Sequence, residues 1–280
     1  MLALEIVIIL IVLMFFVSFL YSNIGLGGGT LYVPIMVFIA FTMKRLEIIP
    51  VSLFLSFMTQ LPAAYTHYKK GLVRFKLGFL LVIATIPGVM LGVLIGIRTT
   101  DFLAYTAFAV LLFIAAIKMI YDIYKKKFDD LSTKDKDYSN SKLIAVFFIS
   151  IVTGIVSAFF GVGGGIVTVP VLIYILGIYP RRAIGTSAFM IIFTSLIGFI
   201  CYSLVSLNLI ELSGIAGPEV PVIPYDLALV LGFSVLIGAY LGSSWGLKEL
   251  KTKSVQIIFV LVIFVVGVQL LLRAFGIFNG

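Results

Sequence analysis

The segment that decides the fold is GLGGGTLYVP at residues 25–34, because the chain repeats it as GVGGGIVTVP at residues 161–170. The register is constant, since 161 − 25, 163 − 27 and 170 − 34 all equal 136. Each glycine cluster is followed by an apolar run that carries a proline at the same place. Two such copies indicate a duplicated unit. In a membrane protein, interruptions at matching positions of two halves point to a substrate site.

Composition indicates the class of protein. Hydrophobic residues make up 62% of the 280 residues and charged residues only 11%, whereas a soluble domain carries about 25% charged residues. Uncharged stretches at residues 6–43 and 143–179 far exceed the roughly 20 residues that one bilayer-spanning helix needs. We therefore predict an all-α polytopic protein of the cell (cytoplasmic) membrane, with the lipid bilayer as its main partner.

Charge and cysteine exclude other classes. The net charge of +8 is typical of basic topology signals in short loops, so we expect no nucleic-acid partner. Cys201 stands alone and cannot form an internal disulfide. The N-terminus lacks a basic region before its apolar run, and we interpret residues 6–21 as a retained helix rather than a cleaved signal.

Apolar runs between polar breaks divide the chain into two membrane repeats, residues 1–121 and 143–280, with five hydrophobic segments each. A charged linker at residues 122–142 separates them, with lysines and aspartates interleaved. We expect this linker to be cytoplasmic. The predicted segments are 4–21, 30–41, 48–65, 77–96 and 102–121 in the first repeat, and 143–160, 166–178, 183–205, 226–245 and 255–275 in the second.

Loop charges predict that the two repeats have inverted topology. The loop at residues 66–76 has four basic residues and no acid, so it is expected inside, whereas the equivalent loop at 206–226 has three acids and no base, so it is expected outside. The lysines at 248, 251 and 253 then lie inside, opposite their counterpart loop around Arg98 and Asp101. Lys44 and Arg45 would fall outside, which counts mildly against this scheme.

Segment length predicts that the first two segments of each repeat form a short or re-entrant hairpin, broken at the glycine motif. Residues 31–41 form a helix of only about 17 Å at 1.5 Å per residue, well short of a hydrocarbon core of about 30 Å. One hairpin would enter from each side. The two glycine turns are then expected to approach each other near the midplane.

The glycine turns have the features of an anion site. Successive glycines permit positive φ and leave backbone N–H groups uncovered, and the helix that follows presents N–H groups without internal partners together with the positive end of its dipole. Close packing at a tight turn is the structural alternative for one motif alone. The candidate substrate-binding residues are Asn23, Gly25, Gly27, Gly28, Gly29, Thr30, Ser52, Gly161, Gly163, Gly164, Gly165, Thr186 and Ser187.

The hydroxyls in this set are expected to donate to the anion, although Ser and Thr in helices also commonly bond to a preceding carbonyl. Gln60, Thr194 and Ser195 are weaker candidates. Small residues four apart, Gly88 with Gly92 and Gly238 with Gly242, are interpreted as helix-packing positions.

No acid or base stands out within the apolar segments. His67, the single histidine, is placed in the basic loop, and a proton-relay role is the lesser interpretation. The sequence has no metal-ligand cluster, no nucleophile–base–acid arrangement and no lysine of the Walker type after the glycines. We therefore predict no metal, no cofactor and no enzymatic activity.

On these residues the chain resembles the sulfite exporter TauE/SafE family of membrane permeases. The resemblance rests on the two Gly-x-Gly-Gly-Gly-x4-Pro motifs and on the segment AIGTS at residues 183–187, and it spans nearly the whole chain. It implies transport of sulfite, sulfonates or related organosulfur acids. The first repeat departs from the pattern, since residues 47–52 lack the Ala-x-x-Thr-Ser of the second, which puts an equivalent contribution of Ser52 in doubt.

We therefore expect a secondary transporter of small anions that works by alternating access of two inverted repeats. A passive anion channel is the alternative; it needs a continuous polar stripe along a pore, which the sequence does not reveal. A membrane-embedded enzyme is a third, with no reactive constellation to support it. The particular anion, the direction of transport, coupling to protons or another ion, and the oligomeric state are left open.

Overall fold

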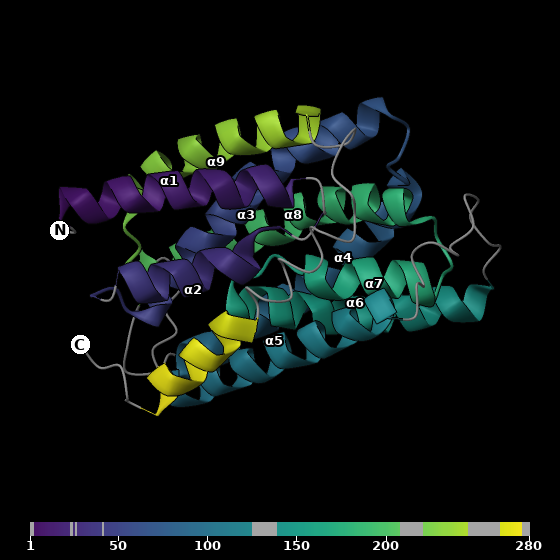
Figure 1. Ribbon diagram of the computed structural model, residues 1–280. Coiled ribbons are helices and arrows are strands. Elements are labelled where there is room, and N and C mark those ends of the chain that lie inside the picture. The colour runs from purple at the N-terminus through teal and green to yellow at the C-terminus, as the bar shows by residue number, and fades with distance from the viewer. Residues whose placement is uncertain are drawn as a thin grey trace.

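The computed structural model describes residues 3–22, 25, 27–40, 42–124, 139–207, 221–245 and 264–275. Regular structure in these ranges is entirely helical (Figure 1). A further short helix, Phe264–Ala274, follows α9. The labelled helices are α1 (Leu4–Tyr21), α2 (Gly29–Ile39), α3 (Arg45–Lys69), α4 (Phe75–Arg98), α5 (Asp101–Tyr124), α6 (Asn140–Phe160), α7 (Gly165–Tyr174), α8 (Pro180–Ser206) and α9 (Tyr225–Trp245).

Six of these helices are long and apolar enough to cross a membrane, namely α1, α3, α4, α6, α8 and α9 as far as Ser244. The prediction of an all-α polytopic membrane protein is confirmed. Two predicted boundaries need correction. Residues 122–124 continue α5 and residues 140–142 begin α6, so the helices extend into both ends of the predicted linker, whose residues 125–138 lie outside the described ranges.

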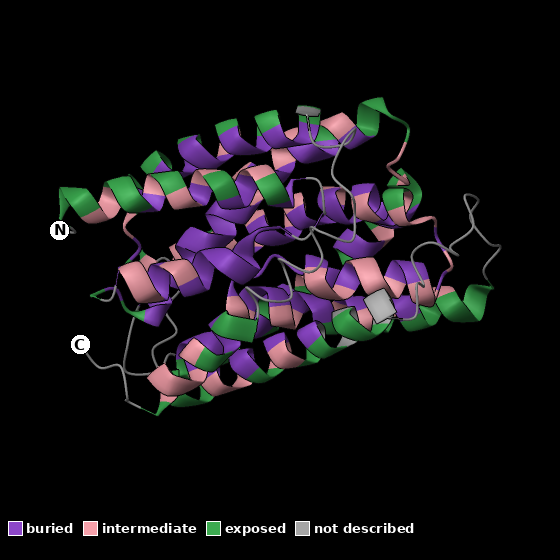
Figure 2. Ribbon diagram, in the orientation of Figure 1, coloured by how far each residue is buried: buried purple, intermediate pink, exposed green. Residues whose placement is uncertain are grey.

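Polarity is distributed as lipid requires. Large apolar side chains face outward, among them Phe148 at 62% exposure and Phe233 at 68%, while Ser52, Thr59 and Gln60 are fully buried. The buried positions gather along the middle of the bundle (Figure 2). Because hydrocarbon offers no hydrogen-bond partner, polar side chains at this depth must lie inside the protein. Candidate substrate groups therefore concentrate between the helices.

Helices from the two halves pair reciprocally. α4 packs along α6, where added Cβ atoms at Gly88 and Gly92 would meet the carbonyls of Ile151 and Ile155. α9 packs along α1 in the same way, with Gly238 and Gly242 against the backbone of Phe15 and Phe19. The interpretation of these glycines as packing positions is confirmed, because a side chain would push the helices apart.

The two central helices, α3 and α8, run antiparallel. Gly198 lies against Leu53, and Gly185 lies against His67, so residue numbers rise along one helix as they fall along the other. α3 and α8 hold equivalent places in the two halves. Equivalent helices that run in opposite directions, and reciprocal pairs α4–α6 and α1–α9, are the contacts that a two-fold relation between halves would give.

The short helices α2 and α7 both begin inside the bundle and run toward opposite ends of it (Figure 1). They contain 11 and 10 residues, or about 15–17 Å at 1.5 Å per residue. Their partners α1 and α6 contain 18 and 21 residues, each long enough to cross the bilayer. The expectation of short segments therefore applies to α2 and α7 only.

The two ends of the bundle differ in charge. Helix directions fix the ends, because α3 runs parallel to α9 (Gly232 beside Phe54, Ser243 bonded to Thr66) and antiparallel to α8. The end where α3 finishes has seven cations and no acid among the described side chains: Lys69, Lys70, Arg74, Lys76, Lys142, Arg181 and Arg182. The opposite end has four of each, namely Lys44, Arg45, Arg98, Arg273, Glu5, Glu47, Asp101 and Asp226.

This asymmetry removes the difficulty posed by Lys44 and Arg45. Arg45 forms an ion pair with Asp101 at 2.8 Å, and the backbone N–H of Lys44 donates to Glu47 at 3.2 Å. Topology follows the excess of basic residues between the two sides, and the excess lies at the other end. Lys248, Lys251, Lys253, Glu211 and Glu219 lie outside the described residues.

Candidate functional site

The two glycine turns touch each other in the interior. A Cβ atom added at Gly29 would lie 2.3 Å from the carbonyl oxygen of Gly161 and 2.6 Å from Cα of Val162. One added at Gly27 would lie 3.1 Å from the carbonyl oxygen of Val162. The expectation that the turns approach each other is confirmed. Only glycine fits at Gly29, because backbone of the other half occupies the space of a side chain.

Both turns have the same left-handed backbone at equivalent positions. The φ angles of Gly25, Gly27 and Gly28 are +66°, +88° and +75°, and those of Gly161, Gly163 and Gly164 are +73°, +84° and +88°. Gly28 and Gly164 are the N-cap residues of α2 and α7. The Gly28 carbonyl accepts from Leu31 and Tyr32, and the Gly164 carbonyl accepts from Val167 and Thr168. The preceding N–H groups, at 29–30 and 165–166, have no acceptor within their own helices.

Each turn is bonded to one serine of the opposite half. Ser52 on α3 donates a hydrogen bond to the Gly161 carbonyl at 2.8 Å, and Ser187 on α8 donates to the Gly25 carbonyl at 3.2 Å. These bonds are equivalent, since Ser52 and Ser187 are 135 residues apart and the two glycines 136. A hydroxyl has one proton. In this conformation neither hydroxyl proton is available to a ligand. Ser52 therefore makes the same kind of contact as Ser187, its counterpart in the second repeat.

The predicted threonines also have protein partners. Thr30 donates to the Tyr21 hydroxyl at 3.0 Å, which joins α2 to α1, and the Thr186 hydroxyl accepts from the N–H of Arg74 at 3.1 Å. Tyr32 covers the first turn, because a Cβ at Gly28 would lie 2.6 Å from its ring. The Tyr32 hydroxyl bonds to Thr59 at 2.7 Å. Asn23 lies outside the described residues.

Polar atoms without partners surround the second turn. A Cβ at Gly163 would lie 3.1 Å from Oγ of Ser195 and 3.4 Å from Cβ of Ser56. Ser56, Gln60 and Ser195 are all fully buried, and the Oγ atoms of both serines and both amide atoms of Gln60 have no hydrogen-bond partner. Leaving a buried polar group unpaired costs about 1–3 kcal/mol. Such unpartnered groups make this place a candidate binding site for a polar ligand.

Sequence reasoning ranked Gln60 and Ser195 as weak candidates and missed Ser56. The signal was present, because Ser52, Ser56 and Gln60 follow one another at intervals of four and therefore share a helix face. Gln60 and Ser195 are also equivalent, 135 residues apart. The structure thus adds unpartnered donors at positions that both halves share.

The buried face of α3 also has a polar stripe that the sequence analysis did not find. It comprises Arg45, Ser52, Ser56, Gln60 and His67, all buried, and extends along the helix with Ile49 and Ala63 between its members. Ser52, Ser56 and Gln60 have zero exposure, so no path wide enough for water reaches them. The central part of the stripe is closed from both ends in this conformation.

The placement of His67 in a loop was wrong. His67 lies in the last turn of α3 and is 1% exposed. A Cβ at Gly185 of α8 would lie 3.2 Å from its Cβ. His67 therefore marks the end of the stripe at the basic end of the bundle.

The fold is that of a polytopic helical membrane protein. The chain matches the family described as Sulfite exporter TauE/SafE over residues 10–270, and it belongs to that family. This membership places it among membrane transporters.

Curated relatives have similar descriptions. Probable membrane transporter protein YunE of Bacillus subtilis is 26% identical over 289 residues, covering 97% of this chain and 99% of the relative. A probable membrane transporter protein of Methanocaldococcus jannaschii is 28% identical over 211 residues, covering 69% and 71%. Sulfite exporter TauE/SafE family protein 2 of Arabidopsis thaliana is 31% identical over 88 residues, 31% of this chain and 19% of the relative. No solved structure matches the chain.

Proposed function

We propose that the protein is a secondary transporter of small anions, of which sulfite and small sulfonates are the leading candidates. The observation that carries the proposal is the contact between two left-handed glycine turns, each at the N-terminus of a short helix, with the unpartnered hydroxyls of Ser56 and Ser195 beside the second turn. The family membership supports the sulfur-containing substrates.

The anion would bind beside the contact between the two turns. The N–H groups at residues 29–30 and 165–166, which have no acceptor within their own helices, would supply two sets of backbone donors, and the positive ends of the α2 and α7 dipoles favour negative charge. Ser56, Ser195 and the Gln60 amide add side-chain donors. Neutral donors of this kind hold an oxyanion without a fixed cation, and an anion bound this way can leave again on either side.

The transport cycle would alternate the access of this site to the two sides. In support, α3 and α8 run antiparallel, and α4–α6 and α1–α9 form reciprocal pairs, as two inverted repeats require. Rocking one repeat against the other would open the stripe on α3 first toward one end and then toward the other. A gradient of protons or of another ion would drive net flux of the anion if the two are coupled.

A passive anion channel remains the second candidate function, and the polar stripe on α3 is the observation that favours it. The zero exposure of Ser52, Ser56 and Gln60 favours an occluded carrier, because an open pore wets its lining. Saturable flux that is stimulated by anion on the opposite side distinguishes the carrier from the channel.

The orientation follows from the charged ends. We infer that the protein lies in the cytoplasmic membrane, with its basic end facing the cytoplasm. That end carries Lys69, Lys70, Arg74, Arg181 and Arg182. The linker at residues 122–142 would then also be cytoplasmic, since α5 ends and α6 begins at this end of the bundle.

The test is flux in proteoliposomes with purified protein. Sulfite, thiosulfate and small sulfonates are supplied in turn, with and without a pH gradient, and counterflow is measured for each. We expect saturable counterflow for at least one of them. Absence of flux and of binding for every anion would overturn the proposal.

A narrower test concerns the turns. Gly28→Val and Gly164→Val each place a branched side chain at φ of +75° and +88°, a region that such residues rarely adopt, so each should abolish flux. The matched control is Gly71→Val, at φ +65° with nothing within 4 Å of its Cβ; it introduces the same backbone strain away from the turns. Normal flux in both turn variants would remove the glycine turns from the site.

A further inference from the structure

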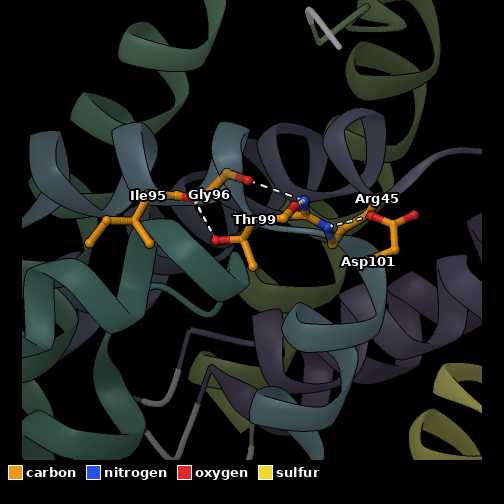
Figure 3. Close-up of polar contacts among 5 residues, drawn as sticks. All are labelled: Arg45, Ile95, Gly96, Thr99 and Asp101. Carbon is orange, nitrogen blue, oxygen red and sulfur yellow. Dashed lines mark hydrogen bonds and ion pairs between the residues drawn. The ribbon is translucent and has the colours of Figure 1, made fainter. Parts of the chain in front are cut away.

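Arg45 has a buried guanidinium at the outer end of the polar stripe. It is only 4% exposed, although it is the first residue of α3. Its Nε donates to Oδ1 of Asp101 at 2.8 Å, and its Nη2 donates to the carbonyl oxygens of Gly96 at 3.1 Å and Thr99 at 2.6 Å (Figure 3). These contacts hold the end of α4 and the start of α5 against α3.

The third nitrogen of this guanidinium is unused. Nη1 of Arg45 is buried and has no hydrogen-bond partner. A guanidinium has five N–H donors and no acceptor. An unpaired donor on a buried cation is costlier than one on a neutral group. The geometry therefore leaves a specific place for an acceptor, and a negatively charged one fits it best.

The single carboxylate paired with Arg45 is poorly placed to neutralise it. The Asp101 side chain is 59% exposed, and it takes one guanidinium nitrogen rather than two, so its attraction is weakened by solvent. Lys44 and Arg98 lie nearby and are exposed. Arg273, whose guanidinium donates to the Val37 carbonyl and lies 5.7 Å from the Tyr105 ring centroid, adds another cation at this end.

Arg45 is also in line with the central site. It precedes Ser52 by seven residues on α3, which is two turns of helix, so both side chains lie on one face about 10 Å apart. Ser52 in turn contacts the second glycine turn. Along this face of α3, the next polar groups after Arg45 are therefore those around the second glycine turn.

We propose that Arg45 forms a second anion station, at the outer end of the polar stripe, with Asp101 on Nε as a counter-ion that competes with the substrate. The ligand class is a small oxyanion, the same class that the central site takes, so this inference rests on the proposed function. Nη1 captures the anion, and the glycine turns receive it.

The test measures anion binding to purified protein and flux in proteoliposomes for wild type, Arg45→Gln, Arg45→Lys and Asp101→Asn. Arg45→Gln should raise KM and Kd roughly tenfold, the effect expected for a lost charge-assisted hydrogen bond. Arg45→Lys should recover part of the loss. The matched control, Lys44→Gln, removes an exposed cation from the neighbouring position and should change neither constant more than twofold.

Asp101→Asn distinguishes a binding role of Arg45 from a structural one. It remains a valid test even if the Arg45→Gln protein fails to fold. If Arg45 binds the anion, removal of the competing carboxylate lowers KM. If the ion pair only anchors α4 and α5, Asp101→Asn raises KM and lowers thermal stability as Arg45→Gln does. A KM for Asp101→Asn that does not fall refutes the station. Wild-type protein without flux would refute the proposed function, whereas normal wild-type flux with unchanged Arg45→Gln constants refutes this inference alone.

Discussion

Gly29→Ala is the most direct test of the contact between the glycine turns. Gly29 is the first residue of α2 and is not among the glycines with positive φ, so alanine there would ordinarily meet no backbone strain. The structure reverses this expectation. The new Cβ would lie 2.3 Å from the Gly161 oxygen, and Cβ atoms essentially never lie closer than 3.0 Å to another atom. The turns must therefore separate by at least 3.0 − 2.3 = 0.7 Å.

This separation has a predictable cost. The atom that the new Cβ would meet is a backbone oxygen, which cannot rotate away as a side chain can. The loss of stability should therefore resemble that of an overpacked core, about 1–3 kcal/mol. The Ser52 hydrogen bond to the Gly161 carbonyl would lengthen as the turn moves, which costs about a further 1 kcal/mol. Donors on the two turns would no longer converge on one anion. Loss of about 1.4 kcal/mol of binding corresponds to a tenfold weaker affinity.

The assay combines counterflow in proteoliposomes with thermal stability in detergent. We expect Gly29→Ala to raise KM at least about tenfold and to lower the melting temperature while the protein remains monodisperse. The control is Gly78→Ala, also a helical glycine, whose Cβ would lie 2.7 Å from the ring of Phe189 rather than from backbone. A clash with this side chain does not separate the glycine turns, so flux should stay within twofold. A Gly29→Ala protein with wild-type KM and stability would refute the contact.

Two further predictions concern the groups around the turns. Ser52→Ala and Ser187→Ala each leave a buried carbonyl unpaired, so each should lower stability by about 1–2 kcal/mol. Because the two bonds are equivalent, thermal unfolding should show similar losses in the two variants. A large effect in one variant alone would contradict that equivalence. Gln60→Ala removes an unpartnered amide, so it should cost little stability while it raises KM about fivefold in counterflow. Gln60→Glu, which adds a negative charge beside the proposed anion, should abolish flux, and active Gln60→Glu protein would exclude Gln60 from the site.

Much of the fold was predictable because it depends on local composition. Apolar runs bounded by charges gave segments within a few residues of the helices, since lipid excludes charge wherever a helix crosses. The glycine turns were equally visible, because positive φ at several successive positions leaves glycine as the main choice. Duplication then supplied a long-range expectation, that two equivalent turns would meet, which a single motif does not support.

The partners of the site residues were not predictable in the same way. Ser52 bonds to a residue 109 positions away and Ser187 to one 162 positions away, and no local pattern encodes such a pairing. Arg45 and His67 were misjudged for a related reason. Charges near segment ends are usually exposed, whereas Arg45 is buried where it bonds to Gly96, Thr99 and Asp101, and His67 is buried against Gly185 of α8.

The cross-bonded serines suggest why the proposed carrier would work in both directions. Each half holds the turn of the other, so neither turn can move without its opposite helix, and a rocking motion must strain both hydrogen bonds together. Because the bonds are equivalent, the inward-facing and outward-facing states would start from similar energies. A bound anion adds contacts to both turns at once and stabilises the closed arrangement between those states. The empty carrier has no such gain, and its unpartnered groups at Ser56, Gln60 and Ser195 raise the cost of closing without substrate. Exchange of anions should therefore be faster than return of the empty carrier, and a ratio of counterflow to net flux near one would argue against this mechanism.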